Sequence, residues 1–146
     1  MFRKIVLVLL VFVLLGARCN KKPAVVKEDW PEPCLAGNGE MPANFPEEFV
    51  YPDSMVNTGM ESIGMEDEKT GHGWEGPSVT FCAKEEPEKI AKWYQDLLTE
   101  KGYELAGKDG GNEWWVKGNE SVSTDVIYNP AGEGVTMFSV QIHKKY

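Results

Sequence analysis

Three cysteines, Cys19, Cys34 and Cys82, are the residues of this chain with the most distinctive chemistry. They lie far apart in the sequence, so they form neither a CxxC redox motif nor a zinc-binding cluster. Cys82 also falls in a strand-like run, whereas a reactive thiolate is favoured at the start of a helix. Their number is odd, and an odd cysteine in an exported protein requires a partner outside the chain or a special role.

The two histidines, His72 and His143, offer little acid–base or metal chemistry. His72 lies in the glycine-rich acidic stretch MEDEKTGHGWEG at 65–76, where the acids at 66–68 could join it in holding a metal ion. These acids do not follow the spacing of a calcium loop, and no second histidine is nearby. We therefore expect a mobile, solvated hairpin loop there and a solvated, outward-facing His143 on the last strand. No catalytic or metal-binding residue and no cofactor is predicted.

The first eighteen residues have the pattern of a secretory signal peptide. A short positive stretch, MFRK, precedes an apolar run over 5–15, and two small residues follow it. Spanning a bilayer needs roughly 20 apolar residues, so this run is too short for a transmembrane anchor. The sequence predicts export, with 1–18 as the signal peptide.

The residues Leu15-Gly16-Ala17-Arg18-Cys19 resemble the lipobox of bacterial lipoproteins. The resemblance implies that Cys19 is lipidated, becomes the mature N-terminus and attaches the protein to a membrane. Arg18 departs from the family pattern, in which a small residue precedes the cysteine. The alternative is that a general signal peptidase cuts after Ala17 and leaves Cys19 free or disulfide-bonded.

If Cys19 carries lipid, the remaining cysteines form one pair. An exported chain resides where disulfides persist, so we predict a Cys34–Cys82 bond. On the chain-entropy model, closing a loop of this length stabilises a domain by roughly 4 kcal/mol.

The charge of the chain excludes one class of partner. Fifteen Lys and Arg against 23 Asp and Glu give a net charge of −8, and removal of the signal peptide makes the chain more acidic still. Such a charge disfavours nucleic acid and anionic lipid surfaces as partners of the folded body.

Residues 19–44 are predicted to be a proline-rich membrane tether, and 45–146 a single α+β domain. The tether contains four prolines and has no apolar period, so we expect it to be extended and largely without regular structure. Trp30 within it is either a clamp onto the domain or an anchor at the membrane interface; we favour the clamp. The domain begins with NFPEEFVYPDSMV at 44–56, whose proline-flanked aromatics predict an extended segment laid over the core.

Two strands and one helix come next. Residues 55–65 form a weak predicted strand, whereas PSVTFCAK at 77–84 alternates clearly, with Val79 and Phe81 on the apolar face. Cys82 falls on the other face, so its disulfide would cross the outer face or an edge of the sheet. The stretch 85–102 predicts an amphipathic helix that packs on the Val79 and Phe81 face. Its apolar stripe is Ile90, Trp93, Tyr94, Leu97 and Leu98.

Three or four short strands, separated by glycine, asparagine and proline turns, are predicted after the helix. The order strand–strand–helix–strands predicts an α+β fold: an antiparallel sheet of five to six strands with one amphipathic helix packed on one face.

Trp114 and Trp115 are adjacent on one of these strands, so one must point inward and the other outward. We expect the outward ring to cover the tether and the disulfide. The alternative is that it forms the centre of an interaction surface, where exposed aromatics are enriched.

The N-terminus, the tether and the FPEEFVYPDSMV entry together resemble small bacterial lipoproteins of unassigned function. The resemblance implies attachment to the cell envelope rather than an activity. Our leading hypothesis is a non-catalytic, lipid-anchored envelope protein, an accessory or interaction module that contacts another protein. The rival hypotheses are an exported module that binds a small ligand or metal, and a hydrolase with His72 or His143 as its base.

Overall fold

The computed structural model describes residues 30–67, 72–126 and 134–145. Cys19 and the predicted signal peptide therefore lie outside the described residues.

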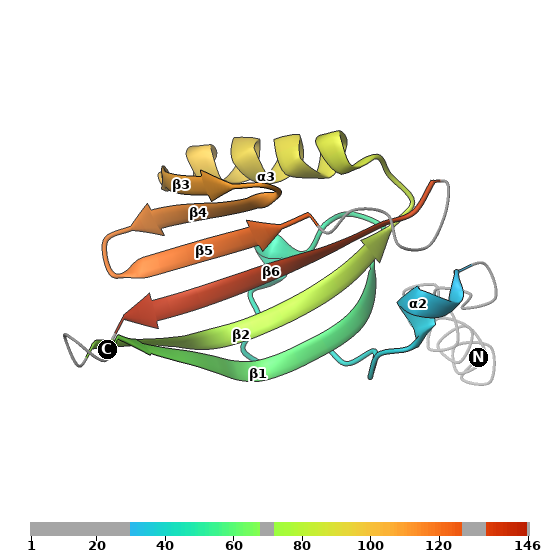
Figure 1. Cartoon of the computed structure of the whole chain (residues 1–146), viewed down its shortest axis with the longest axis horizontal. Coiled ribbons are helices and arrows are strands. Elements are labelled where there is room, and N and C mark those ends of the chain that lie inside the picture. Colours follow the sequence, from blue (N-terminus) through green and yellow to red (C-terminus); the bar gives the residue numbers. More distant parts are fainter. Residues whose placement is uncertain (1–29, 68–71, 127–133, 146) are drawn as a thin grey trace, which may run out of the picture.

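The described chain forms one six-stranded antiparallel sheet with one main helix on one face (Figure 1), which confirms the predicted α+β fold. The order across the sheet is β1-β2-β6-β5-β4-β3, so the last strand in the sequence lies near the centre. The strands are β1 (Met55–Asp67), β2 (His72–Ala83), β3 (Glu104–Asp109), β4 (Asn112–Lys117), β5 (Glu120–Asp125) and β6 (Thr136–Lys145). The helical elements are α2 (Glu32–Leu35), the 3-10 turn η2 (Glu47–Phe49) and α3 (Pro87–Glu100).

Helix α3 supplies one wall of the core. Pro87 lies at the start of the helix, where its missing N–H costs nothing. Ile90, Tyr94 and Leu98 are fully buried against the sheet face that carries Val79 and Phe81, as the stripe predicted. The buried hydroxyl of Tyr94 donates to the carbonyl oxygen of Phe49 at 2.9 Å. This bond joins the helix to the segment that enters the domain.

The proline-flanked aromatic segment does lie over the core. Phe45 and Phe49 are buried, and Phe45 meets Phe81 edge-to-face at 5.8 Å. Tyr51 contacts Trp93 of the helix. The extended path is interrupted by the 3-10 turn η2 and by a turn at Pro52 and Asp53, where Asp53 has a φ of 55° and the Ser54 N–H donates to the Tyr51 carbonyl oxygen at 3.2 Å.

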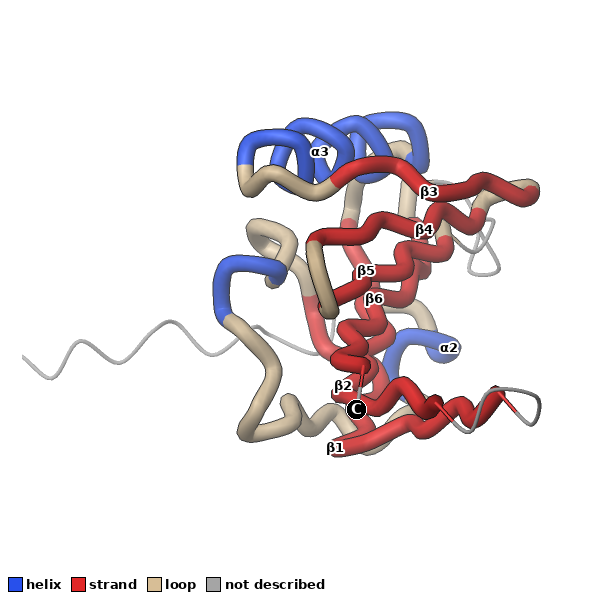
Figure 2. Tube along the Cα trace, turned by 90° about the vertical axis from the view of Figure 1, so that its left-hand side faces the viewer, coloured by secondary structure: helices blue, strands red, loops and turns tan. Residues whose placement is uncertain are grey.

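Residues 30–44, assigned above to the tether, form a segment that we call the strap. The expectation that this stretch lacks regular structure is wrong for Glu32–Leu35, which forms the single helical turn α2 with Pro31 at its N-cap. Figure 2 shows α2 and α3 on opposite sides of the sheet. The strap therefore covers a face that the main helix leaves open.

The loop predicted at 65–76 is mostly strand. β1 continues to Asp67 and β2 begins at His72, and these two residues pair across the ladder. Only 68–71 separate the strands, and they lie outside the described residues. The acidic stretch therefore extends the hairpin, because its glycines are accommodated within the ladder.

Candidate functional site

A small second core, separate from the one under α3, surrounds the predicted disulfide. Cys34 and Cys82 are bonded and buried, with their Cα atoms 5.9 Å apart. Trp30 and Met55 are buried with them, and Val135 and Met137 pack at the margin. This cluster lies on the outer face of the sheet, opposite α3, as the alternation around Cys82 predicted. Trp30 is thus a clamp onto the domain.

Two further contacts hold the strap at this cluster. The buried Asn57 of β1 donates both amide hydrogens to α2, to the carbonyl oxygens of Pro33 at 2.9 Å and Cys34 at 3.0 Å. The ammonium of Lys84 lies 5.1 Å from the centre of the Trp30 ring, a cation–π contact. The N-terminal end of the described chain is therefore fixed covalently, by hydrogen bonds and by packing.

The strap then runs along the free edge of β1. The Gly39 N–H donates to the Asn57 carbonyl oxygen at 2.8 Å. Asn38 bonds Gly59 twice, accepting from its N–H and donating to its carbonyl oxygen, both at 3.1 Å. A Cβ on Gly59 would collide with the Glu40 carbonyl oxygen, so glycine is what permits this close approach.

The adjacent tryptophans divide between the two faces, as predicted. Trp115 is 6% exposed in the core under α3, and its indole N–H has no hydrogen-bond partner among the described residues. Trp114 is 39% exposed on the outer face. Its ring lies over Gly107 of β3, where an added Cβ would be 3.6 Å from it. An aromatic side chain that covers a glycine on an edge strand helps to fix the register of that strand.

The expectation that the outward tryptophan covers the disulfide is wrong. Trp114 lies on β4, and β5 and β6 separate that strand from the β2 strand that carries Cys82. Trp30, from the strap itself, covers the disulfide instead. Trp30 and Trp114 therefore lie in two separate regions of the outer face.

Between these two regions the outer face is polar. Trp114 pairs with Ser123, which pairs with Gln141, which pairs with Ser78. The hydroxyls of Thr80 and Ser139 hydrogen-bond across neighbouring strands at 2.9 Å. Serine and threonine pairs of this kind stabilise a sheet and leave little exposed apolar surface.

His143 is buried, and the prediction that it is solvated is wrong. It is 3% exposed, and β2 approaches β6 closely beside it: a Cβ on Gly76 would collide with the Ile142 carbonyl oxygen and lie 3.3 Å from the His143 Cα. Its Nε2 lies 3.3 Å from the Gln141 side-chain oxygen, and its Nδ1 has no partner among the described residues. Burial lowers the pKa of His143 below its ordinary value of 6.5.

A buried carboxylate under α3 is explained by its partners. Glu113 is 4% exposed and accepts from Lys108 Nζ at 2.7 Å and from Gln95 Nε2 at 2.9 Å. A buried charge that is paired and hydrogen-bonded in this way is a structural feature of the sheet and its helix.

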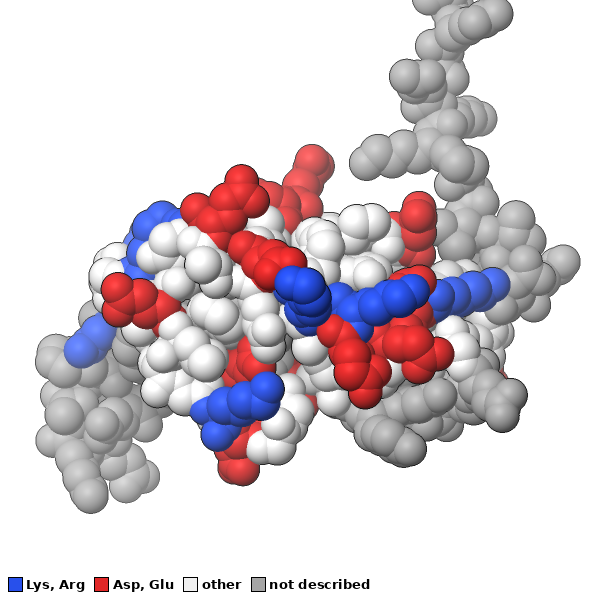
Figure 3. Space-filling model, turned by 90° about the horizontal axis from the view of Figure 1, so that it is seen from above, with Lys and Arg blue, Asp and Glu red and all other residues white. Residues whose placement is uncertain are grey.

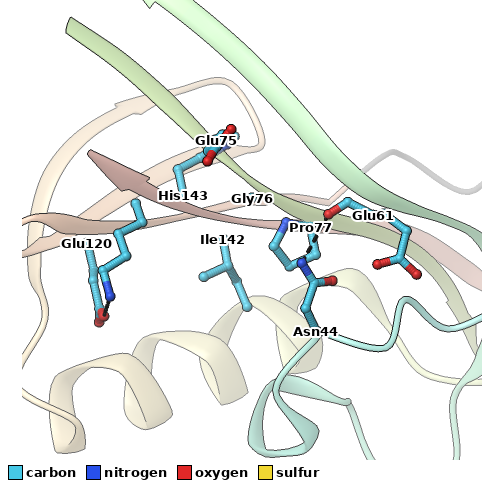
Figure 4. A pocket seen from close by; sticks show the side chains of 9 residues that line it. Asn44, Glu61, Glu75, Gly76, Pro77, Glu120, Ile142 and His143 are labelled. Carbon is cyan, nitrogen blue, oxygen red and sulfur yellow. Dashed lines mark hydrogen bonds and ion pairs between the residues drawn. The ribbon is translucent and has the colours of Figure 1, made fainter. Parts of the chain in front are cut away.

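A groove that the sequence did not predict opens beside the end of β6 (Figure 4). Its volume is about 510 Å³, and it is lined by both acidic and basic side chains. In it, Asn44 donates to the Glu61 carbonyl oxygen at 3.1 Å, and Lys144 lies 3.9 Å from Glu120. A second groove of about 530 Å³ shares Glu120 and Ile142 with it. Segments distant in the sequence build both grooves, so no local sequence motif predicts them.

The charges of the surface are mixed. Figure 3 shows acidic and basic side chains interspersed over α3 and β3, with uncharged side chains between them. Several are paired, such as Lys92 with Asp96 at 2.8 Å on one turn of α3. This face carries no field of a single sign that would steer a charged ligand.

Within the parts of the chain that the structure describes, no three histidine, cysteine or acidic side chains are grouped so as to hold a metal ion. No helix of these residues has the length and apolarity to cross a membrane.

No protein-family model matches the sequence, and no curated protein or solved structure shows detectable similarity to it.

Proposed function

We propose that the protein is an exported, non-catalytic module that is anchored to the bacterial cell envelope by lipid on Cys19 and contacts another protein. The observation that carries the proposal is the buried Cys34–Cys82 bond with Trp30 packed on it. Disulfides persist in exported proteins and are rare in the cytosol, so this bond supports the signal-peptide pattern of 1–18.

The disulfide also leaves Cys19 as the one cysteine that needs another role. Only ten residues, 20–29, separate Cys19 from the clamped Trp30. A lipid on Cys19 would therefore attach the membrane close to a rigid point of the domain. This arrangement suits a module that presents a fixed surface near the membrane.

Trp114 supports the interaction part of the proposal, and Trp115 does not. Trp115 belongs to the core, so Trp114 is the one exposed ring of the predicted pair. Val116, two residues after Trp114, is exposed on the same face of the strand. Exposed tryptophans are enriched among residues that dominate protein interfaces. Two exposed apolar side chains form a small surface, which fits a transient contact.

The surroundings of His143 support a non-catalytic role. A general base must be oriented by a partner and reach a nucleophile. The hydrogen-bonding neighbour of the His143 ring among the described residues is the amide of Gln141, and the ring is buried.

Intact mass of the protein purified from membranes, before and after reduction, tests the proposal. We expect the mass of residues 19–146 plus lipid, increasing by two hydrogens on reduction as Cys34–Cys82 opens. The Cys19→Ser variant is the control, and we expect it to appear in the soluble fraction. An unlipidated species beginning at Arg18 would contradict the anchor and make this a soluble exported protein with one unpaired thiol, that of Cys19.

A further inference from the structure

Three exposed, large apolar side chains belong to the strap and to the strand that it covers. They are Leu35 in α2, Met41 in the strap and Met60 in β1. The described exposed apolar side chains outside this region, Leu105, Trp114 and Val116, lie on β3 and β4, at the opposite edge of the sheet.

The contacts of the strap bring these three residues to one edge of the molecule. Gly37, two residues after Leu35, lies against Asn57 of β1. Glu40 and Pro42, which flank Met41, lie against Gly59, the residue before Met60. Leu35, Met41 and Met60 therefore follow one another along the β1 edge, which we call the strapped edge.

The described chain begins beside one end of this edge, because Trp30 packs in the same cluster as Met55, the first residue of β1. Eleven residue steps join Trp30 to Cys19, and at the extended rise of about 3.1 Å per residue they allow a reach of at most roughly 34 Å. The radius of gyration of a domain of this size is about 13 Å. A lipid on Cys19 thus holds the strapped edge within about one domain diameter of the bilayer.

We propose that the strapped edge rests on the lipid bilayer, with Leu35, Met41 and Met60 in the headgroup region. This inference rests on the lipid anchor proposed above and specifies how the anchored domain is oriented. The tether raises the local concentration of the edge at the bilayer, so a weak apolar contact is sufficient.

The charges favour apolar contact over electrostatic attraction. Glu32, Glu40 and Glu61 lie on the same three elements as the exposed apolar side chains, and the chain as a whole is acidic. Anionic headgroups would repel such an edge, whereas apolar side chains enter the headgroup boundary whatever the lipid charge. In this orientation the β3 edge and Trp114 are the parts of the sheet farthest from the strapped edge, where a protein partner can reach them.

Met60 and Leu105 provide a matched pair of positions for the test, since they are 48% and 50% exposed on opposite edges of the sheet. Met60→Cys and Leu105→Cys are introduced separately into the full lipidated chain and labelled with a polarity-sensitive fluorophore. Each protein is reconstituted in phosphatidylcholine vesicles, and quenching by acrylamide from the aqueous phase is measured. Intact mass establishes the lipid and the Cys34–Cys82 bond in each sample.

We expect quenching at position 60 to be at least about threefold weaker than at position 105 in vesicles, because a side chain in the headgroup boundary is shielded from water. The same labels on a Cys19→Ser background in solution should be quenched equally. Equal quenching at both positions in vesicles, with lipid present, would overturn the proposed orientation and leave the anchor intact. Absence of lipid in the mass would overturn the anchor and, with it, this inference.

Discussion

The two edge strands of the sheet, β1 and β3, are protected in different ways from pairing with other chains. The β1 edge belongs to a thirteen-residue strand, and a long unpaired edge is a template for aggregation. The strap covers its part from Asn57 to Glu61 with backbone and side-chain hydrogen bonds and is held by a disulfide. The β3 edge has six residues, charged side chains and a bulge between Leu105 and Gly107. The long β1 edge is thus protected by being covered, and the short β3 edge by being irregular and charged.

The largest expected effect comes from removing the disulfide that holds the strap. Replacing both Cys34 and Cys82 by alanine should lower the free energy of unfolding by about 4 kcal/mol, because the unfolded chain regains the entropy of an open loop. Urea denaturation of the domain measures this difference. A loss below about 1 kcal/mol would show that the strap is held without the bond, and the contrast between the edges would weaken.

The tryptophans at the two edges should differ in their contributions. Trp30→Ala should cost about 3 kcal/mol, since the ring is buried on the disulfide. Trp114→Ala should cost about 1 kcal/mol or less, because its half-exposed ring loses mainly its contact with Gly107. Thermal or urea unfolding compares the two variants. Equal losses of unfolding free energy in the two variants would contradict the view that the β1 edge is covered and the β3 edge is not.

A matched pair of glycines sharpens the comparison. Gly59→Ala places a Cβ against the Glu40 carbonyl oxygen and should cost about 2 kcal/mol as the strap is displaced. Gly107→Ala meets only the Trp114 ring at 3.6 Å and should be neutral or stabilise by about 0.5 kcal/mol. Amide hydrogen exchange locates the change: Gly59→Ala should deprotect β1, and unchanged protection there would count against the strap.

The smallest expected effect is a pH dependence that belongs to neither edge. Burial lowers the pKa of His143 on β6 from 6.5, so the unfolded chain binds a proton more readily than the folded one. The contribution of His143 to the free energy of unfolding should be constant above about pH 6.5 and should be lost as the pH decreases through the lower pKa of the folded state.

Comparison of urea midpoints at pH 7.5 and 5.0 for the native chain and His143→Gln isolates this contribution. The carboxylates common to both proteins cancel in the difference. An identical pH dependence in the two proteins would show that His143 has the same pKa in the folded and the unfolded chain and would contradict the effect of its burial.

The sequence predicted what local patterning controls. The alternation of Val79, Phe81 and Ala83 fixed a strand and its faces, and the stripe through Ile90 and Tyr94 fixed the helix that covers it. The face assigned to Cys82 followed from the same alternation, and parity of the cysteines led to its partner. Each of these inferences needs only the geometry of one element.

What could not be predicted depends on contacts between distant segments. The strap bonds β1 through Asn38 and Asn57, residues that read locally as turn or polar strand positions. His143 is buried where Gly76 of another strand comes close to its backbone, whereas alternation along β6 alone suggested solvent. Parity predicted that one of the two adjacent tryptophans points outward, but it did not show that this one is Trp114, and the contact with Gly107 required the register of β3.

The place of β6 in the strand order constrains how the protein can be made. The β1–β2 hairpin and the β3–β4–β5 meander are joined in the sheet only through β6, which is the last strand to be synthesised. Until residues 136–145 are available, the two halves share no ladder, and the edges of β2 and β5 remain open. Assembly of the sheet is therefore a late event that follows the synthesis of residues 136–145. During that interval, a chain that crosses a membrane unfolded keeps the flexibility that the crossing requires.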